Sequence, residues 1–414
     1  MTGGKDILLV SYYFPPLGMG GVGRPYALAK CLPEHGYRVH VLTVKNIMYP
    51  AYDYAPLESL DRDLIYRTGS LDPSRLLYLL GKRKQKQPGY PGITGRLPVY
   101  LPDLKRGWNY FAIRRAGRVI KRHKVSTVIT TSPPVSSHLI GLKLKLKYGI
   151  KWIADFRDFW FPLPIEKAYR QGFTRNYSLR LKDMIVRNAD AIVAVNEDIR
   201  DYLGRGEVIY NGADESAAEF WKRGFRKEGN SFTIGLLGTF NELVPIEPLL
   251  AAVRRIIDAE KEGGRKIYLK HAGQSDNSMR AQIKKYDLID RVELMGYLPK
   301  EEAMVSLAPC NVLYLALKNT APYHILPGRT FELMMSGKPI VGLVPHDSAV
   351  GRLLREYPAG IVIDDMSIDR LAEVIIAIMN EQVSSNVLID ANLAYKYSSR
   401  RMADDYASLI GGLV

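Results

Sequence analysis

The 414-residue sequence contains only two cysteines, Cys31 and Cys310, and both lie in apolar stretches. Two isolated thiols form neither a disulfide framework nor a cysteine metal site, and this usage is typical of a reducing cytoplasm. The first residues lack a cationic stretch followed by a long apolar one, so we expect no signal peptide. No run of about 18 apolar residues occurs, so we expect no membrane-spanning helix. These absences predict a cytoplasmic protein that is soluble or lies on a membrane surface.

Acidic residues are scarce in the first half of the chain. Residues 1–213 contain 34 Lys and Arg against 17 Asp and Glu, a net charge of +17, whereas residues 214–414 contain 24 against 26, a net charge of −2. Residues 82–124 alone carry thirteen basic side chains and one acid, Asp103. This asymmetry indicates an anionic partner for the first half only. No nucleic-acid recognition motif accompanies the charge, so we do not expect that partner to be a nucleic acid.

Hydrophobic residues make up 47% of the chain, enough for sizeable cores. We expect a strand at residues 6–12, because its uninterrupted apolar core Ile-Leu-Leu-Val is typical of a strand buried on both faces of a parallel sheet. A glycine-rich loop at 18–23, a helix at 25–34 and a strand at 38–43 complete one strand–helix–strand unit. The alternation continues, and we expect further strands at residues 127–131, 151–154, 191–196 and 207–210.

A second run of alternating strands and helices follows a polar stretch at 214–230, where we expect a linker. We expect its strands at residues 232–237, 267–272, 292–295, 312–316 and 339–344. The sequence therefore predicts an α/β fold with two doubly wound, Rossmann-like domains facing each other across a cleft. We expect an N-terminal domain at 1–213, a C-terminal domain at 214–392, and a C-terminal helix at 393–414 that returns to the first domain. Ligands of such sheets bind at the carboxyl ends of the strands.

Residues 327–332 form the strongest candidate binding motif. Pro327 and Gly328 precede a short helix, and a helix N-terminus opened by glycine presents free backbone N–H groups to an anion. Arg329 adds a fixed charge, the Thr330 hydroxyl adds a donor, and Glu332 can accept hydrogen bonds from ribose hydroxyls. Alternatively, Glu332 is simply an acid favoured in a first helical turn.

The run PGRTFELMMSGKPIVG at 327–342 resembles the donor-binding signature of family 4 of the retaining glycosyltransferases. Other segments occur in the family's order along nearly the whole chain: ILLVSYYFPPLGMGGVGR, VIYNGAD, GLLGTFNE, KHAGQSD, RVELMGYLPKEEA and NLAYKYSSRRMADDYASLI. The resemblance implies the GT-B fold and retaining transfer of a hexose or amino-hexose from a UDP- or GDP-linked sugar. The acceptor would be a lipid-linked glycan or a polysaccharide of the cell surface. A nucleotide-sugar epimerase and a non-catalytic nucleotide-sugar-binding homologue are the alternatives.

The resemblance also implies a set of donor-binding residues. Glycines of the first loop would approach the donor sugar or the acceptor, although a tight turn alone also explains them. The loop after residue 237 would line the diphosphate, and Tyr297 would meet the nucleobase unless it is a packing residue. The full predicted set is Gly20, Gly21, Asn211, Gly238, Thr239, Tyr297, His324, Leu326, Pro327, Gly328, Arg329, Thr330 and Glu332.

Two departures from the family pattern affect this set. His324 stands where many members have a glutamate that contacts the donor sugar. The loop Thr239-Phe240-Asn241-Glu242 lacks the Arg and Lys that many members place there, and we expect Arg329 to supply the missing charge, since a guanidinium can bind phosphate through two hydrogen bonds.

The segment IADFRDFW at 153–160 places two carboxylates and an arginine at the end of a buried strand. Asp155, Arg157 and Asp158 are therefore candidates for acceptor or donor-sugar contact, and with Arg329 and Glu332 they form the predicted catalytic set. A structural ion-pair network is an equally good interpretation of the first three. His138 lies in a predicted helix and is interpreted as a core or surface histidine.

The resemblance implies a mechanism that relies on stabilising the diphosphate electrostatically rather than on a side-chain nucleophile. No carboxylate pair resembles a metal-binding motif, so we expect neither a metal nor a cofactor beyond the nucleotide sugar as co-substrate.

The basic first half would take the acceptor in this family. Around residues 108–111, aromatic side chains sit among Lys105, Arg106, Arg114, Arg115 and Arg118, a pattern compatible with an interfacial helix. An anionic membrane attracts such a segment by roughly 1 kcal/mol per basic residue. We therefore expect peripheral binding to the inner face of the cell membrane, with an ordinary solvated basic face as the alternative.

Overall fold

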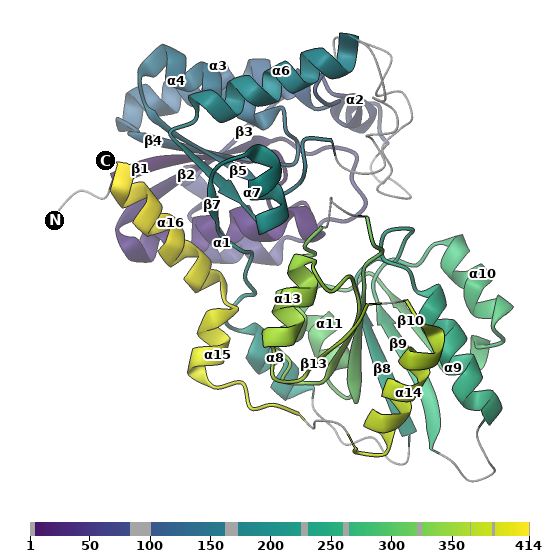
Figure 1. The fold of residues 1–414 in the computed structure, drawn as a ribbon. Helices are drawn as coiled ribbons and strands as arrows, with labels where there is room; N and C mark the ends of the chain where they lie inside the picture. Colours follow the sequence, from purple (N-terminus) through teal and green to yellow (C-terminus); the bar gives the residue numbers. More distant parts are fainter. Residues whose placement is uncertain are drawn as a thin grey trace. The chain divides into compact units, whose positions relative to one another are not determined.

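The structure, a computed structural model, describes residues 5–82, 101–161, 173–224, 231–259, 265–320, 325–364, 366–382 and 386–413. The chain forms two compact units (Figure 1). The first comprises Met1–Asn211 and Ser399–Val414, and the second comprises Gly212–Ser398. The sequence analysis placed the corresponding divisions after residues 213 and 392.

The first unit is built on a seven-stranded parallel sheet with the order β3-β2-β1-β4-β5-β6-β7. The order reverses between β1 and β4, and this reversal is the point where doubly wound sheets bind ligands. The strands are β1 (Lys5–Val10), β2 (Tyr37–Val44), β3 (Ile65–Thr68), β4 (Thr127–Thr131), β5 (Lys151–Phe156), β6 (Ala191–Ala194) and β7 (Glu207–Val208).

Helices cover both faces of this sheet (Figure 1). On one face, α1 packs against α16, and the core includes Ile7, Leu28, Val41 and Tyr406. On the other face, α3 contacts β1, β2 and β3, and α4 contacts β4 and β5. The helices are α1 (Gly23–Cys31), α2 (Pro73–Leu79), α3 (Asn109–His123), α4 (Ser137–Tyr148), α6 (Phe173–Asn188), α7 (Glu197–Leu203) and α16 (Ser399–Leu413).

The second unit contains a six-stranded parallel sheet with the order β10-β9-β8-β11-β12-β13. Its strands are β8 (Ser231–Leu237), β9 (Lys266–Ala272), β10 (Val292–Gly296), β11 (Val312–Ala316), β12 (Ile340–Leu343) and β13 (Gly360–Ile363). Its helices are α8 (Ala217–Arg223), α9 (Glu247–Ala259), α10 (Asn277–Lys285), α11 (Lys300–Leu307), α12 (Arg329–Met334), α13 (Ala349–Glu356), α14 (Ile368–Met379) and α15 (Ala391–Lys396).

The apolar core of the second unit lies between the sheet and the helices α9, α10 and α14, and includes Ile234, Leu249, Ile283 and Ile375. The helix α11 contacts β8, β9 and α8. Both sheets have the strand order of a Rossmann fold, with the first strand of each unit in the middle. The prediction of two doubly wound α/β domains is therefore confirmed.

Three details differ from the sequence-based expectation. The short strands β3 and β13 were not expected, and α8 occupies part of the stretch 214–230 where a linker was expected. The helix α8 forms because Ala217 and Trp221, four residues apart, are buried on one face. No helix in the described ranges combines the length and the apolar character that crossing a membrane requires.

Candidate functional site

Gly238 follows β8 directly, at the carboxyl end of the central strand of the second unit. Its φ of +87° is in the left-handed region that favours glycine. A Cβ atom at this position would lie 2.5 Å from Nη1 of Arg329. The absence of a side chain at residue 238 therefore lets the arginine approach the end of the strand.

Arg329 is the first residue of α12, and its side chain binds backbone carbonyls at the end of β8 and in the loop that follows. Its Nη1 donates to the carbonyl oxygens of Leu237 at 2.8 Å and Thr239 at 3.1 Å. The guanidinium carbon also lies 5.4 Å from the centre of the Phe240 ring. The structure thus brings Gly238, Thr239 and Arg329 together, as the sequence predicted.

The guanidinium of Arg329 is poorly solvated and pairs with no carboxylate among the described residues. Its Nε is shielded from solvent and makes no hydrogen bond in the described part of the chain. Burial lowers the pKa of Arg329 to about 10, and the charge of Glu332 offsets this only in part. A cation that has lost water without gaining a carboxylate is stabilised when an anion binds.

His271 is a member of this site that sequence reasoning missed. Its Nε2 lies 2.7 Å from the carbonyl oxygen of Gly238, so this nitrogen carries the proton and donates. Burial lowers the pKa of His271, which keeps the ring neutral. A Cβ on the neighbouring Gly273 would lie 2.1 Å from the Gly238 carbonyl oxygen, so glycine is required there too. His271 and Gly273 both lie in the segment KHAG, which the sequence analysis noted. Their contact with Gly238 could not be recognised there, because it depends on the pairing of β8 with β9.

Glu332 lies in the first turn of α12 and pairs with Lys300, the first residue of α11. Lys300 Nζ is 2.5 Å from Glu332 Oε1, and the lysine side chain is 58% exposed against 14% for the glutamate. The backbone carbonyl of Glu332 accepts a hydrogen bond from Trp221 Nε1 at 2.9 Å. The glutamate side chain is therefore largely buried while its lysine partner is exposed, and Lys300 was not recognised from the sequence.

The remaining predicted donor residues of this unit are placed as follows. Thr330 is buried, and its hydroxyl has no hydrogen-bond partner within the described ranges. Leu326 is buried, Gly328 is exposed, and Tyr297 is 36% exposed at the end of β10. Pro327 accepts a hydrogen bond from the amide of Thr330 at 3.0 Å and so begins the helical turn. His324 lies outside the described residues.

In the first unit, Asp155 at the end of β5 is fully buried and paired with Arg24 of α1. Its oxygens accept hydrogen bonds from Arg24 Nε at 3.0 Å and Nη2 at 3.0 Å, and from Thr131 Oγ1 at 2.7 Å. Although burial opposes ionisation, the Arg24 guanidinium and these hydrogen bonds hold the pKa of Asp155 below its usual value. Arg24 also donates to Asn211 Oδ1 at 3.3 Å and to the Tyr406 hydroxyl at 3.1 Å.

This network connects α1 and β5 with Asn211 and with α16. Because the Asp155 oxygens are already bonded within the protein, the network favours a structural role for Asp155 over direct substrate contact. Its catalytic role stays a prediction. Arg24 was not singled out in the sequence, although it directly follows the glycine-rich loop.

Arg157 links the glycine-rich loop to the end of β4. Its Nη1 donates to the carbonyl oxygen of Gly21 at 2.9 Å, and its Nε donates to the carbonyl oxygen of Ser132. Its Nη2 is shielded from solvent and has no partner among the described residues. Burial raises the pKa of the adjacent Asp158, with Arg157 partly opposing that effect. Gly20 begins the 3-10 helix Gly20–Val22 of the same loop.

His138 lies in α4 and is fully buried, as a core histidine would be. Its Nδ1 is 2.9 Å from Thr130 Oγ1, and the centre of its ring is 4.2 Å from the centre of the Phe156 ring. Burial lowers the pKa of His138 to about 3, so the ring is neutral at physiological pH.

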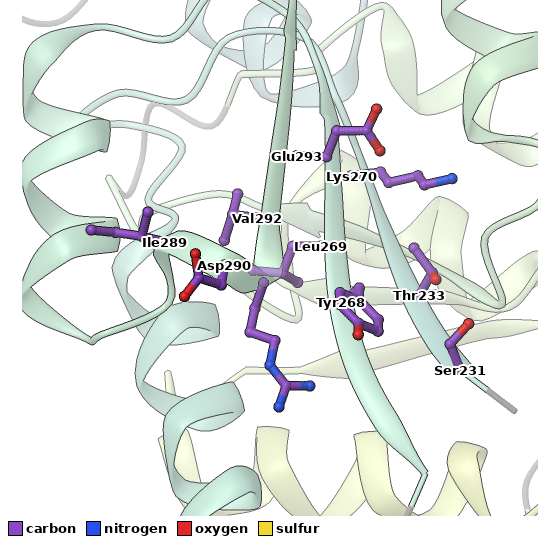
Figure 2. A pocket seen from close by; sticks show the side chains of 10 residues that line it. Ser231, Thr233, Tyr268, Leu269, Lys270, Ile289, Asp290, Val292 and Glu293 are labelled. Atoms are coloured by element: carbon purple, nitrogen blue, oxygen red, sulfur yellow. The ribbon is translucent and has the colours of Figure 1, made fainter.

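A groove of about 320 Å³ lies elsewhere on the second unit (Figure 2). It is lined by Ser231, Thr233, Tyr268, Leu269, Lys270, Ile289, Asp290, Arg291, Val292 and Glu293. Ser231 and Val292 are the first residues of β8 and β10, so the groove reaches the amino ends of the strands. None of the predicted donor-binding residues lines it, and it is not the site described above.

The sequence model of Glycosyltransferase Family 4 matches residues 19–217, which contain the glycine-rich loop, Asp155, Arg157 and Asn211. The first half of the chain therefore carries the sequence pattern of glycosyltransferase family 4. The Gly21–Arg157 contact and the Arg24–Asp155 pair both lie in the matched region. No curated protein sequence matches the chain.

Solved structures with the same fold cover nearly the whole chain. Sucrose-phosphate synthase from Thermosynechococcus elongatus has a TM-score of 0.67 at 16% identity, with 99% of each chain covered. HepE from Anabaena in complex with UDP-glucose has a TM-score of 0.61 at 15% identity, with 98% of this chain and 99% of that chain covered. A UDP-N-acetylglucosamine 2-epimerase described as putative, from Listeria monocytogenes, has a TM-score of 0.53 at 11% identity, with 99% and 96% covered. At these identities the similarities show the GT-B fold and no more.

Proposed function

We propose that the chain transfers a hexose or amino-hexose from a UDP- or GDP-sugar, with retention of configuration, to a lipid-linked or polysaccharide acceptor in cell-surface glycan synthesis. The observation that carries the proposal is the desolvated guanidinium of Arg329 at the carboxyl end of β8. It is a cation that pairs with no carboxylate in the part of the chain that the structure describes, and it lies at the strand-order reversal where Rossmann-like sheets bind phosphates.

The donor diphosphate binds against the loop Gly238–Thr239 and the start of α12. Arg329 supplies the charge, and Thr330 supplies a hydroxyl whose hydrogen bond is not otherwise used in the described structure. Glu332 accepts hydrogen bonds from the ribose, and Lys300 pairs with the same carboxylate. The nucleobase lies near Tyr297.

In the first unit, Arg157 and Asp158 contact the donor sugar or the acceptor, next to the glycine-rich loop that Arg157 holds. Asp155 acts as a positioning residue, because its oxygens already accept hydrogen bonds from Arg24 and Thr131. This assignment divides the Asp155–Arg157–Asp158 cluster between a structural and a substrate-binding role.

The acceptor hydroxyl approaches the anomeric carbon on the side of the leaving group. The bond between the anomeric carbon and the phosphate oxygen breaks, and the bond to the acceptor oxygen forms on the same face. The departing phosphate oxygen takes the hydroxyl proton. The reaction therefore depends on stabilising the charge that develops on the diphosphate, which Arg329 and backbone amides provide without a metal.

The test is turnover of a panel of UDP- and GDP-sugars by the purified chain, comparing the wild type with Arg329→Met. Arg265→Met is the matched control, because Arg265 also lies over a phenylalanine, 5.5 Å from the Phe232 ring, and bonds the backbone carbonyl of Ser231 at 3.2 Å. We expect donor turnover in the wild type and the control, and at least a tenfold loss of kcat/KM in Arg329→Met. An epimerised sugar nucleotide as the product, or no binding of any donor, would contradict the proposal.

We also propose that the first unit binds an anionic membrane surface by α3 and α4. These contacting helices expose Arg114, Arg118, Lys121, Arg122, Lys143 and Lys147, together with Tyr110 at 59% and Leu146 at 70% exposure. Trp108 does not belong to this surface, contrary to the sequence-based expectation. It is fully buried, and its Nε1 donates to Thr68 Oγ1 at 2.8 Å.

Co-sedimentation with vesicles tests the membrane proposal. We expect binding to anionic vesicles at low salt, weaker binding at high salt, and none to neutral vesicles. Replacing Arg114, Arg118 and Lys121 by Glu should abolish the binding. No co-sedimentation of the wild type with anionic vesicles at low salt would reject the proposal.

A further inference from the structure

Two imidazoles and one carboxylate converge in the first unit, away from the residues of the proposed transferase site. Asp6 lies near the start of β1, His40 lies on β2, and His123 is the last residue of α3. One potential ligand atom from each lies within 4.8 Å of the others. The site residues described above follow the carboxyl ends of strands, whereas Asp6 lies near the amino end of β1. The five residues from Asp6 to Ser11, which directly follows β1, span about 16 Å of extended strand.

The fold itself produces this convergence. In the parallel pairing of β1 with β2, Asp6 is opposite Arg38 and Leu8 is opposite His40. Asp6 and His40 therefore sit diagonally on one face of the sheet. The same face is covered by α3, which ends at His123 because Lys124 adopts the left-handed conformation with φ of +52°.

The side chains are already in mutual contact. Asp6 Oδ1 is 2.6 Å from His40 Nε2, and the centres of the two imidazole rings are 4.3 Å apart. The Tyr66 hydroxyl lies 3.2 Å from His40 Nδ1 and 3.3 Å from His123 Nε2. His40 is fully buried, and Asp6 and His123 are partly exposed. The cluster therefore has both a fixed inner ligand and a path to solvent.

We propose that Asp6, His40 and His123 form a binding site for Zn²⁺ or a similar divalent transition metal. Two imidazole nitrogens and one carboxylate oxygen are ligands that zinc prefers, and three protein ligands leave the fourth position to water. Calcium and magnesium prefer all-oxygen sites and do not fit this set. The Tyr66 hydroxyl provides the outer hydrogen bond that usually orients a metal-bound histidine.

Metal binding requires a small local movement. With ligand distances near 2.1 Å and tetrahedral angles, Asp6 Oδ1 and His40 Nε2 would stand about 3.4 Å apart instead of forming their present hydrogen bond. The Asp6 side chain can move in this way because it is partly exposed and lies near the start of β1.

Neighbouring positive charges set a limit on the affinity. Arg38 and Arg122 are sequence neighbours of the cluster, and Arg115 lies over the Tyr66 ring at 4.8 Å. These cations oppose a divalent ion, so we infer an exchangeable site that ties α3 to β1 and β2 and is not required for folding. It takes no part in the transferase chemistry.

The test is zinc binding by the full chain, free of any histidine tag and treated with a chelator, measured by calorimetric titration and by the rise in Tm. The matched control is His35→Ala, which removes a histidine of the same unit that pairs with a single carboxylate among the described residues, Asp404, at 2.8 Å. We expect one Zn²⁺ per chain, at least tenfold weaker binding in His123→Ala, and wild-type binding in His35→Ala. Co²⁺ in place of Zn²⁺ should give the visible absorption of a four- or five-coordinate site, which disappears in His123→Ala.

Failure of the wild type to bind one equivalent of Zn²⁺, or equal binding by His123→Ala, would overturn the proposal. If His123→Ala does not fold by circular dichroism, His123→Gln serves instead, since its amide can still bond the Tyr66 hydroxyl. Equal binding by that variant would overturn the proposal in the same way.

Discussion

Substituting alanine for Gly238 tests how closely the donor site depends on backbone geometry. The left-handed φ of +87° costs an L-residue about 1–2 kcal/mol. The new Cβ would also lie 2.5 Å from Arg329 Nη1, so the guanidinium has to move. Losing one of its two hydrogen bonds to the carbonyls of Leu237 and Thr239 costs about 1.5–3 kcal/mol more, since the donor is charged.

We therefore expect Gly238→Ala to lower the free energy of unfolding of the second unit by about 2.5–5 kcal/mol. Displacement of the Arg329 guanidinium from the donor diphosphate should also weaken nucleotide binding by at least tenfold. The first quantity is measured by urea denaturation and the second by calorimetric titration with UDP and GDP.

Gly204→Ala is the matched control, because Gly204 has a φ of +77° but nothing within 4 Å of its potential Cβ. It should lose only the backbone contribution of about 1–2 kcal/mol and bind nucleotide like the wild type. If Gly238→Ala binds nucleotide as tightly as Gly204→Ala does, Arg329 does not act at the diphosphate.

Three further predictions concern single side chains. Asp155→Asn leaves the buried Arg24 without its counter-ion and should lower the free energy of unfolding by about 3–5 kcal/mol in urea; a loss below 1 kcal/mol would contradict the structural role. The pKa of His138 is about 3 in the folded chain against about 6.5 when unfolded, so the unfolded state binds the extra proton between these values. The free energy of unfolding should therefore fall on acidification below pH 6.5, by up to about 1.4 kcal/mol per pH unit, and His138→Gln should remove this contribution; an unchanged slope refutes it. Glu332→Gln should weaken binding of UDP or GDP about fivefold but leave a 2′,3′-dideoxy nucleotide unaffected, because only ribose hydroxyls gain from the carboxylate; an equal loss for both ligands would place Glu332 elsewhere.

The parts of the fold that were predictable are those that local sequence encodes. β1 and β8 are rich in consecutive apolar residues because both faces of a central parallel strand are buried. β3 and β13 were missed because each has only four residues, most of them half-buried. The sequence of β3, Ile-Tyr-Arg-Thr, has no apolar run, and the run Ile-Val-Ile in β13 is only three residues long.

The site shows the same division between local and long-range information. Arg329 and Glu332 could be recognised because the motif around α12 is contiguous in the sequence. The pairing of Arg24 with Asp155 joins residues 131 positions apart, and sequence alone left a structural network and a catalytic role equally open. Trp108 was assigned to a membrane surface because its neighbours are basic, but its indole is part of the core of the first unit.

The central claim is that the diphosphate of a nucleotide sugar binds where β8 ends and α12 begins. A crystal structure of the chain soaked with UDP or GDP tests it most directly. The account predicts phosphate density beside Gly238, Thr239 and the Arg329 guanidinium, with the ribose at Glu332 and the base near Tyr297. Density for the nucleotide at any other place, with the Arg329 surroundings empty, would contradict it.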